Sequence, residues 1–240
     1  MKLICLNTWG GRVHQPLLNF LEENKDVDVF CFQEIYREAP HPIVEDKGDR
    51  LNLFSEIEGV LSGHQGSFRP DFENWFGQAM FTKKDLFVAE EKSLRVFEIE
   101  SEQKGNHSRH LQCIHVQKNE MDLTVANVHG LWNGKGKTDT EERLEQSRRI
   151  KTFMENVGGR KILCGDFNLL PGTESIKILD SMNMRNLIHM YGVTSTRTSL
   201  YTKPDKFADY MFVSQEIKVN DFRVLPDEIS DHAALYLDFE

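Results

Sequence analysis

Short apolar runs of strand length alternate with amphipathic segments along this chain. Runs rich in Val, Ile, Leu and Phe between polar turns are typical of β-strands, and apolar residues at helical spacing are typical of helices. Strands are predicted over residues 2–9, 26–33, 78–83, 96–100, 110–117, 122–129, 160–167, 209–214 and 233–239, and helices over 16–24, 49–61, 139–156 and 173–182. This alternation predicts an α/β or α+β fold.

Two predicted helices are preceded by capping residues. Thr138 or Asp139 would cap the third helix, and Thr173, after Pro171-Gly172, would cap the fourth, because their side chains accept the first free backbone N–H groups of a helix. Residues 184–208 are polar and irregular, and we expect them to form a functional surface loop with short strands.

The composition suits one globular domain over residues 1–240 with a sizeable core, since 39% of the residues are apolar. No apolar run approaches the roughly 18–20 residues that a membrane span needs, and we expect neither a transmembrane segment nor a signal peptide. All four cysteines lie inside apolar strand-like runs, which favours buried reduced thiols and a cytoplasmic location over a disulfide framework. These cysteines are Cys5, Cys31, Cys113 and Cys164.

The net charge of −9 and the sequence pI of about 5.5 bear on the choice of substrate. A protein that grips long nucleic acid through many phosphates usually presents a basic surface. The acidic balance therefore argues against a clamp on long DNA, but it allows a small phosphate ester or a locally basic cleft.

Polar side chains recur where apolar strands end, and loops at sheet ends commonly carry catalytic groups. They are Asn7, Glu34, His129, Asp166, Asn168, Asp209, Asp231 and His232. Glu34 leaves a nearly apolar strand, and its carboxylate suits Mg²⁺ or Mn²⁺, although a solvated strand-end glutamate is the plainer alternative. Asp166 and Asn168 alternate across Phe167, and they offer an acceptor for water and an amide for an oxyanion, or else an Asx turn.

The two histidines among these residues have simpler readings as well. His129 ends a strand, and a core histidine bonded to backbone is the alternative to catalysis. Asp231 and His232 are neighbours whose side chains point opposite ways on a strand, so Asp209 is the better candidate to hold the imidazole.

Taken in order, these motifs resemble the endonuclease/exonuclease/phosphatase superfamily, which includes pancreatic deoxyribonuclease. The resemblance spans residues 4 to 238 and rests on LNTW with Asn7, FQEI with Glu34, Gly77-Gln78-Ala79-Met80, NVHG with His129, GDFN at 165–168, ADYMFV at 208–213 and SDH at 230–232. It implies a four-layer sandwich of two packed mixed β-sheets flanked by helices, with the active site at one edge.

The resemblance also implies roles for individual residues. Glu34 would be the principal ligand of Mg²⁺, or of Mn²⁺, with Asn7 beside it and Asp231 in the metal shell. Asp166 would orient or deprotonate the attacking water, and Asn168 would bind the scissile phosphate. His232, held by Asp209, would contact a phosphate oxygen or transfer a proton, and His129 would match the second histidine of the deoxyribonuclease-like branches.

The activity implied is divalent-metal-dependent hydrolysis of a phosphate ester by a monomer, with a phosphodiesterase or nuclease favoured and nucleic acid as a partner. A phosphomonoesterase or phosphoinositide phosphatase of the same fold is the first alternative, and an inactive member that only binds a phosphorylated ligand is the second. The chain lacks a counterpart of the tyrosine near the phosphate in apurinic endonucleases and a long basic insertion, which weakens the case for an abasic-site nuclease.

The segment after His129 offers further candidates. Trp132 would stack on a base or ring of the substrate, and Lys137 would meet a phosphate. From Arg143 onward we expect a charged helix surface with Arg–Glu pairs. Six other histidines, His107 and His110 among them, are assigned to surface or loop positions.

Overall fold

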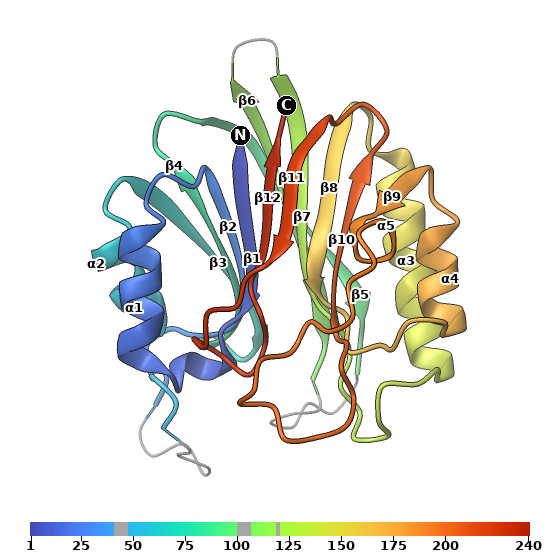
Figure 1. Ribbon diagram of the computed structural model, residues 1–240, viewed down its shortest axis with the longest axis horizontal. Coiled ribbons are helices and arrows are strands. Elements are labelled where there is room, and N and C mark those ends of the chain that lie inside the picture. Colours follow the sequence, from blue (N-terminus) through green and yellow to red (C-terminus); the bar gives the residue numbers. More distant parts are fainter. Residues whose placement is uncertain (41–47, 100–106, 119–120) are drawn as a thin grey trace.

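The computed structural model describes residues 1–40, 48–99, 107–118 and 121–240. Two six-stranded mixed sheets pack face to face, and helices cover their outer faces, which gives four layers (Figure 1). The predicted α/β sandwich is confirmed. No helix in the described ranges is both long and apolar enough to cross a bilayer.

The first sheet has the strand order β11-β12-β1-β2-β4-β3. Its only parallel pair among the described residues is β1 with β2, and the other neighbours are antiparallel. Its strands are β1 (Lys2–Asn7), β2 (Val29–Tyr36), β3 (His64–Phe72), β4 (Phe76–Lys83), β11 (Val219–Val224) and β12 (Leu235–Phe239).

The second sheet has the order β5-β6-β7-β8-β10-β9, with β7 and β8 parallel. Its strands are β5 (Phe87–Phe97), β6 (Arg109–Lys118), β7 (Met121–His129), β8 (Arg160–Asp166), β9 (Met184–Asn186) and β10 (Asp209–Ser214). The core between the sheets takes apolar side chains from the facing sides of both, for example Cys5, Cys31, Val125 and Cys164.

Each sheet is covered by helices on the face turned away from its partner (Figure 1). A second apolar cluster joins the outer face of the first sheet to α1 and α2, while α3 and α4 add apolar side chains to the cluster of the second sheet. The helical elements are η1 (Trp9–Gly11), α1 (His14–Glu23), α2 (Leu53–Val60), α3 (Glu141–Asn156), α4 (Glu174–Asp180) and α5 (Leu187–Met190).

Strand direction brings the polar strand ends together. Asn7 and His129 are the last residues of β1 and β7, and Asp166 is the last residue of β8. Asp209 opens β10 and pairs with Asp166, because β10 runs antiparallel to β8. These residues therefore meet at one edge of the sandwich, as expected for polar groups mounted on a rigid sheet.

Several elements differ from the prediction. Strands β3 and β11 were not predicted, because sequences such as HQGSFRPDF contain Gly, Pro and charged residues and lack an apolar face. Strand β5 begins at Phe87 rather than 96, since it is an exposed edge strand whose side chains are mostly polar; residue 100 lies outside the described residues. The loop predicted at 184–208 contains a short strand, β9, as expected, but also the short helix α5, which was not predicted.

The capping predictions had different outcomes. Thr173 caps α4 as predicted, and its side chain accepts the N–H of Ile176. The cap of α3 is Thr140, not Thr138 or Asp139, and its side chain makes no capping hydrogen bond. Asp139 instead accepts the N–H groups of Glu174 and Ser175, so it caps the neighbouring helix α4 through a tertiary contact.

Candidate active site

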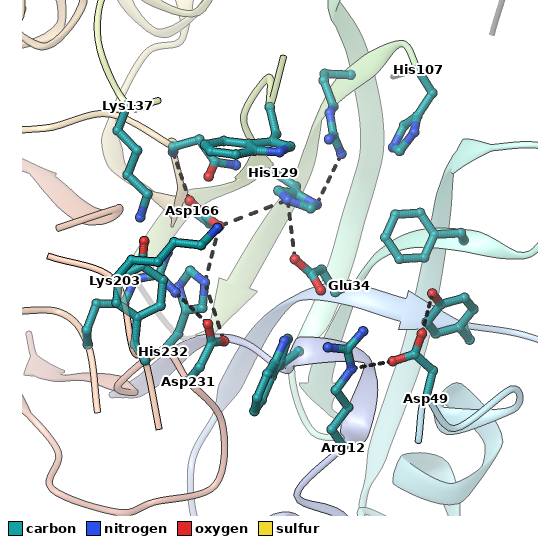
Figure 2. Close-up of a pocket in the computed structure, with 18 of the residues that line it drawn as sticks. Arg12, Glu34, Asp49, His107, His129, Lys137, Asp166, Lys203, Asp231 and His232 are labelled. Carbon is teal, nitrogen blue, oxygen red and sulfur yellow. Dashed lines mark hydrogen bonds and ion pairs between the residues drawn. The ribbon is translucent and has the colours of Figure 1, made fainter. Parts of the chain in front are cut away.

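A cavity of about 590 Å³ opens at the edge of the sandwich where these strands end (Figure 2). Six of the predicted residues lie in its wall, namely Glu34, His129, Asp166, Asn168, Asp231 and His232, together with the two candidates Trp132 and Lys137. Asn7 and Asp209 lie behind this wall and contact it through hydrogen bonds.

Glu34 reaches the cavity through an irregularity in β2. The pairing of β2 with β4 shifts between Gln33 and Ile35, which makes Glu34 the extra residue of a β-bulge, and its backbone has φ +57°. A left-handed conformation is unfavourable for a side chain larger than Gly and is found mainly at functional positions. The bulge therefore turns the carboxylate out of the strand alternation and into the cavity.

Asn7 joins two of the carboxylates. Its amide nitrogen donates to Oε1 of Glu34 at 3.0 Å and to Oδ2 of Asp166 at 2.9 Å, and its Oδ1 accepts the N–H of Trp9. In this arrangement Asn7 fixes the distance between Glu34 and Asp166. Its assignment as a metal ligand stays a prediction.

Asp166 and Asn168 form the end of the GDFN segment. The N–H of Asn168 donates to Oδ1 of Asp166 at 2.8 Å, so the Asx turn considered as the simpler alternative is present, with both side chains still at the cavity. Asn168 has φ +54° rather than an extended backbone, and its amide nitrogen donates to the carbonyl of Gly130. Gly165 is required, since a Cβ there would lie 2.0 Å from the carbonyl oxygen of Val128.

His232 is held by Asp209. This agrees with the expectation that Asp231, whose side chain points the other way, would not be its partner. Its Nδ1 donates to the Asp209 carboxylate at 2.9 and 3.0 Å, and Thr196 donates to the same carboxylate. The other ring nitrogen, Nε2, lies 3.6 Å from Oδ2 of Asp166. Burial, and then the nearby Arg197 guanidinium, lowers the pKa of His232, so the ring is neutral and Nε2 is a proton acceptor.

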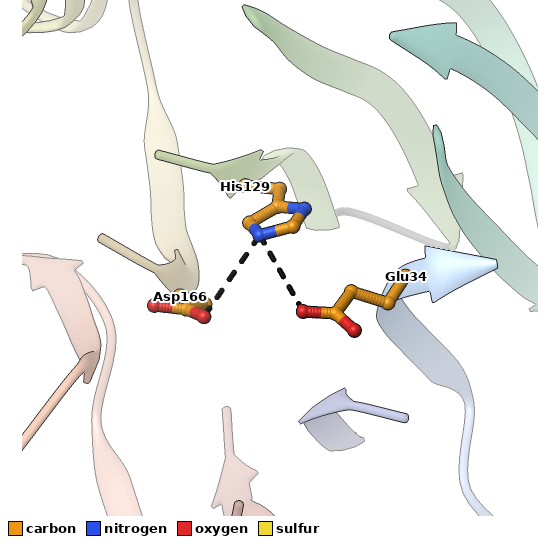
Figure 3. A group of neighbouring side chains, drawn as sticks. All are labelled: Glu34, His129 and Asp166. Carbon is orange, nitrogen blue, oxygen red and sulfur yellow. Dashed lines mark ion pairs between the residues drawn. The ribbon is translucent and has the colours of Figure 1, made fainter. Parts of the chain in front are cut away.

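In His129 the two ring nitrogens have the opposite roles to those in His232. Nη1 of Arg109 lies 3.2 Å from Nδ1, and because a guanidinium only donates, Nδ1 must accept and Nε2 must carry the proton. Nε2 points towards the carboxylates of Glu34 and Asp166, at 3.8 and 4.0 Å (Figure 3). Burial and the charge of Arg109 lower the pKa of His129 well below its usual value.

Arg109 and its neighbours are residues that the sequence analysis missed. Arg109 is 2% exposed, at the start of β6. His107 lies in the loop before β6, as predicted, although it is buried, and the assignment of His110 to a surface or loop position was wrong, because it is buried within β6. His107 lies in the cavity wall, and His110 is paired with the buried Asp71 at 3.0 Å. The only sequence signal was the position of Arg109 one residue before a predicted strand.

The loop after His129 is held in place by hydrogen bonds from the side chain of Arg143. This side chain is fully buried and donates to the carbonyl groups of Leu131, Gly136 and Thr138, so the prediction of a surface position was wrong for it. The pairs expected further along the helix are present, for example Arg149 with Glu145 at 3.0 Å. The loop holds its side chains towards the cavity.

The cavity wall brings three carboxylates close to one another, those of Glu34, Asp166 and Asp231. Glu34, His129 and Asp166 carry atoms of metal-ligand type that all lie within 4.8 Å of one another, but Nε2 of His129 carries a proton, so the two carboxylates are the ligands among them. Burial and the carboxylates of Asp231 and Asp166 raise the pKa of Glu34 to about 7, against a hydrogen bond from Asn7 that lowers it. Oδ1 of Asp231 is buried and has no hydrogen-bond partner among the described residues, while its Oδ2 is paired with Arg197 at 3.1 Å.

With this geometry defined, the sequence matches the Endonuclease/Exonuclease/phosphatase family over residues 4–232. The chain belongs to the endonuclease/exonuclease/phosphatase family. No curated protein matches it significantly.

Solved structures of this family share the fold. A mannosyl-6-phosphatase of Bacteroides thetaiotaomicron is 17% identical and superposes with a TM-score of 0.77, over 100% of this chain and 99% of its own. The human Nocturnin catalytic domain with bound sulfate is 19% identical, with a TM-score of 0.68 over 100% of this chain and 93% of its own. A humanized D. rerio TDP2 is 13% identical, with a TM-score of 0.69 over 100% and 98%.

Members of this family are generally divalent-metal dependent, and the residues present fit such an ion. Oxygen ligands from carboxylates are those that Mg²⁺ prefers. Glu34 and Asp166 supply them, and the unpartnered oxygen of Asp231 is the kind of buried acceptor that a cation satisfies. The candidate metal site is thus built from strand-end carboxylates that a cation would bind.

Proposed function

We propose that this family member hydrolyses a phosphate ester with water, with Asp166 at the centre of the reaction. The observation that carries the proposal is the pair of opposite imidazoles around that carboxylate. His129 presents Nε2–H as a donor and His232 presents Nε2 as an acceptor, and both nitrogens lie within 4.0 Å of Oδ2 of Asp166.

The acceptor side suits water activation. A water molecule held between Oδ2 of Asp166 and Nε2 of His232, which are 3.6 Å apart, would lose its proton to this pair as its oxygen attacks phosphorus. The bond from phosphorus to the alcohol oxygen would break, and the alcohol would leave after taking up a proton from water. Asp209 keeps the His232 ring oriented and would stabilise it once it is protonated. This hydrogen bond favours the proton-transfer role of His232 over the direct phosphate contact that was the alternative.

The donor side suits the phosphate. Nε2–H of His129, the amide of Asn168 and the ammonium group of Lys137 would bind the equatorial oxygens, where negative charge concentrates in the transition state. Lys137 is 3% exposed and donates to the carbonyl of Phe207, so its ammonium group is held at the wall rather than in solvent.

Glu34 would be the principal metal ligand, with Asp231 and the bridging Asn7 beside it. A bound Mg²⁺, or Mn²⁺, would supply Lewis-acid polarisation of the phosphate and offset negative charge. The bulge at Glu34 and the hydrogen bonds of Asn7 hold the carboxylates close to one another before any cation binds.

A phosphodiester, nucleic acid included, is the substrate class that the motifs favour. A phosphomonoester is the second candidate, and the net charge of −9 favours it, because a protein that grips long nucleic acid usually has a basic surface. The cavity wall itself combines aromatic side chains with five cationic ones, which suit the phosphate of either substrate class. A cytoplasmic location, a single domain over 1–240 and a monomeric state are part of the same proposal.

The test is a substrate panel in Mg²⁺, Mn²⁺ and EDTA, with Asp166→Asn as the inactive variant. The panel contains bis- and mono-nitrophenyl phosphate, DNA, RNA and a phosphoinositide. Asp221→Asn is the matched control, because Asp221 forms an exposed ion pair with Arg223 on β11, away from the cavity. We expect metal-dependent turnover that Asp166→Asn abolishes and Asp221→Asn leaves unchanged. Turnover retained by Asp166→Asn, or unaffected by EDTA, would refute the proposal.

A further inference from the structure

All three tryptophans of the chain line the one cavity that holds the carboxylates and histidines. They are Trp9, Trp75 and Trp132, and each is partly exposed there. Partly exposed indoles in the wall of a polar site are suited to contact the face of a ring-shaped ligand. Neither the proposed water activation nor the phosphate contacts use them, so they need another explanation.

The cavity has two chemically different ends on either side of the carboxylates (Figure 2). At one end, Arg197 stacks on Tyr201 at 4.1 Å, with the ammonium group of Lys137 5.1 Å from the same ring, so this end is cationic and suits phosphate oxygens. At the other end, beside Glu34, lie Arg12 and Asp49. The phosphate therefore faces one end, and the alcohol of the ester faces the other.

The end beside Glu34 combines a carboxylate and a guanidinium with aromatic rings. Nε of Arg12 donates to Oδ1 of Asp49 at 2.6 Å, and the hydroxyl of Tyr36 donates to Oδ2 at 3.1 Å. Trp75 lies parallel to Tyr36, with ring centroids 6.0 Å apart, and Arg12 lies 5.0 Å from the centroid of the Trp9 ring. We call these five side chains the ring end of the cavity.

The ring end is rigidly built. Asp49 is held against the turn after β1, where the N–H of Arg50 donates to the carbonyl of Gly10 at 2.8 Å. A Cβ at Gly10, which has φ +64°, would lie 2.8 Å from Oδ1 of Asp49. The side chain of Asp49 is only 6% exposed, so two segments far apart in sequence place one buried carboxylate at the cavity wall.

The ring end offers both hydrogen-bond donors and hydrogen-bond acceptors that are not yet used. Among the described residues, the terminal nitrogens of Arg12 make no hydrogen bond, and each oxygen of Asp49 uses one hydrogen bond and keeps a second acceptor site. Hydroxyl groups on adjacent carbons of a ligand both donate and accept hydrogen bonds, so they could bind Arg12 and Asp49 together.

We infer that the ring end binds the alcohol part of the substrate, and that this alcohol is an uncharged polyhydroxylated ring of the hexose type. Its hydroxyl groups would bond to Arg12 and Asp49, and its apolar face would lie against Trp9 or Trp75. The inference rests on the proposed function, because it places the ester bond at Asp166. Of the two substrate classes in the proposed function it selects the second, the phosphomonoester, and names it as a sugar phosphate rather than a nucleic acid or a phospholipid.

The first experiment compares substrates with one phosphate and different alcohols: mannose 6-phosphate, glucose 6-phosphate, glycerol 3-phosphate, AMP and nitrophenyl phosphate. We expect kcat/KM to be highest for a hexose phosphate. Asp49→Asn keeps the shape of the side chain, and we expect it to lower the ratio of kcat/KM for hexose phosphate to that for nitrophenyl phosphate about 10- to 100-fold, as for hydrogen bonds to a charged group. Asp221→Asn should leave the ratio unchanged.

Two kinetic outcomes would overturn the inference while the proposed hydrolysis stands. One is a wild-type enzyme that prefers AMP or glycerol 3-phosphate to both hexose phosphates. The other is an Asp49→Asn protein that loses activity equally on all esters, since that would mean a merely structural role for Asp49. Absence of turnover on every ester in Mg²⁺ and Mn²⁺ would instead contradict the proposed function.

A binding measurement tests the inference even if no ester is turned over, and it does not require Asp49→Asn to fold. Because all three tryptophans line the cavity, intrinsic fluorescence of the Asp166→Asn protein reports on its occupant. We expect saturable quenching or a spectral shift with mannose 6-phosphate or glucose 6-phosphate, at concentrations where inorganic phosphate gives none, and we expect Trp75→Leu to weaken this binding. Equal responses to hexose phosphate and inorganic phosphate would overturn the inference.

Discussion

Nη1 of Arg109 lies 3.2 Å from Nδ1 of His129, and this contact fixes which nitrogen of the imidazole carries the proton. A guanidinium has no acceptor, so Nδ1 must be unprotonated and Nε2–H must face the cavity. His232 is fixed in the opposite tautomer by the carboxylate of Asp209, 2.9 Å from its Nδ1. The two histidines of this site are therefore different chemical groups, one a donor and one an acceptor.

Arg109→Met removes the group that sets the His129 tautomer. We expect kcat to fall about 10- to 100-fold, the usual effect of losing a group that orients a catalytic residue. The pKa of His129 should rise, because the charge of Arg109 lowers it. Nitrogen NMR of the His129 ring measures both the tautomer and the pKa, and Arg148→Met, at an exposed position on α3, is the control. An unchanged tautomer in Arg109→Met would contradict the assigned role.

Asp209→Asn should free the His232 ring while leaving the fold intact, because the amide has nearly the same shape. We expect kcat to fall about 10- to 100-fold with a smaller change in KM, since the substrate contacts are made by other residues. Steady-state kinetics on the preferred ester tests this. If kcat stayed within about twofold of wild type, far less than such an orienting contact is worth, the Asp209–His232 hydrogen bond would have no part in the reaction.

Metal affinity should depend on pH through Glu34, whose pKa is raised to about 7. A protonated carboxylate is a poor ligand, so affinity for Mg²⁺ or Mn²⁺ should fall as pH drops through about 7, by about tenfold per unit for one released proton. Calorimetric titration between pH 5 and 8, a range of roughly three units around this value, measures the effect. Glu34→Gln should bind weakly throughout, and its affinity should show no such step. A wild-type affinity independent of pH would argue against Glu34 as the principal ligand.

The same raised pKa has a consequence for stability in EDTA. Between about pH 4.5, the usual pKa of the group, and about 7, the native state binds the Glu34 proton more tightly than the unfolded state does. Stability falls with rising pH wherever the native state holds more protons. The Glu34 contribution to the free energy of unfolding should therefore fall as pH rises through this window, and urea unfolding of wild type against Glu34→Gln would detect it.

Gly165→Ala tests the close contact of β8 with β7. The added Cβ would lie 2.0 Å from the carbonyl oxygen of Val128, and the backbone at Gly165 has φ +146°, so we expect a loss of more than about 3 kcal/mol in the free energy of unfolding. Gly59→Ala in α2 meets no atom within 4 Å and should stabilise by about 0.5–1 kcal/mol, as a helix-interior replacement of glycine does. Urea unfolding of the two variants gives the comparison. A mild effect at Gly165 would mean that the two strands can separate.

Much of the fold is predictable because the apolar strands are locally encoded. Runs such as VFCFQ and KILCGD are buried on both faces, and the structure places them in the centre of the two sheets as β2 and β8. Edge strands such as β3 and β5 were missed or shortened, because their stability comes from pairing with a neighbour rather than from an apolar face of their own. The cap of α3 was misassigned for a related reason, since Asp139 caps a different helix through space.

The sequence by itself determined the family, the two-sheet sandwich and the polar residues at the strand ends, because each is written in a short local pattern. Only the tertiary structure decided what those residues do to one another. The bulge that exposes Glu34, the donation of Arg109 to His129 and the pairing of Arg12 with Asp49 each depend on contacts between distant segments. No local pattern encodes them, since a buried arginine and an exposed one look alike until their neighbours are known.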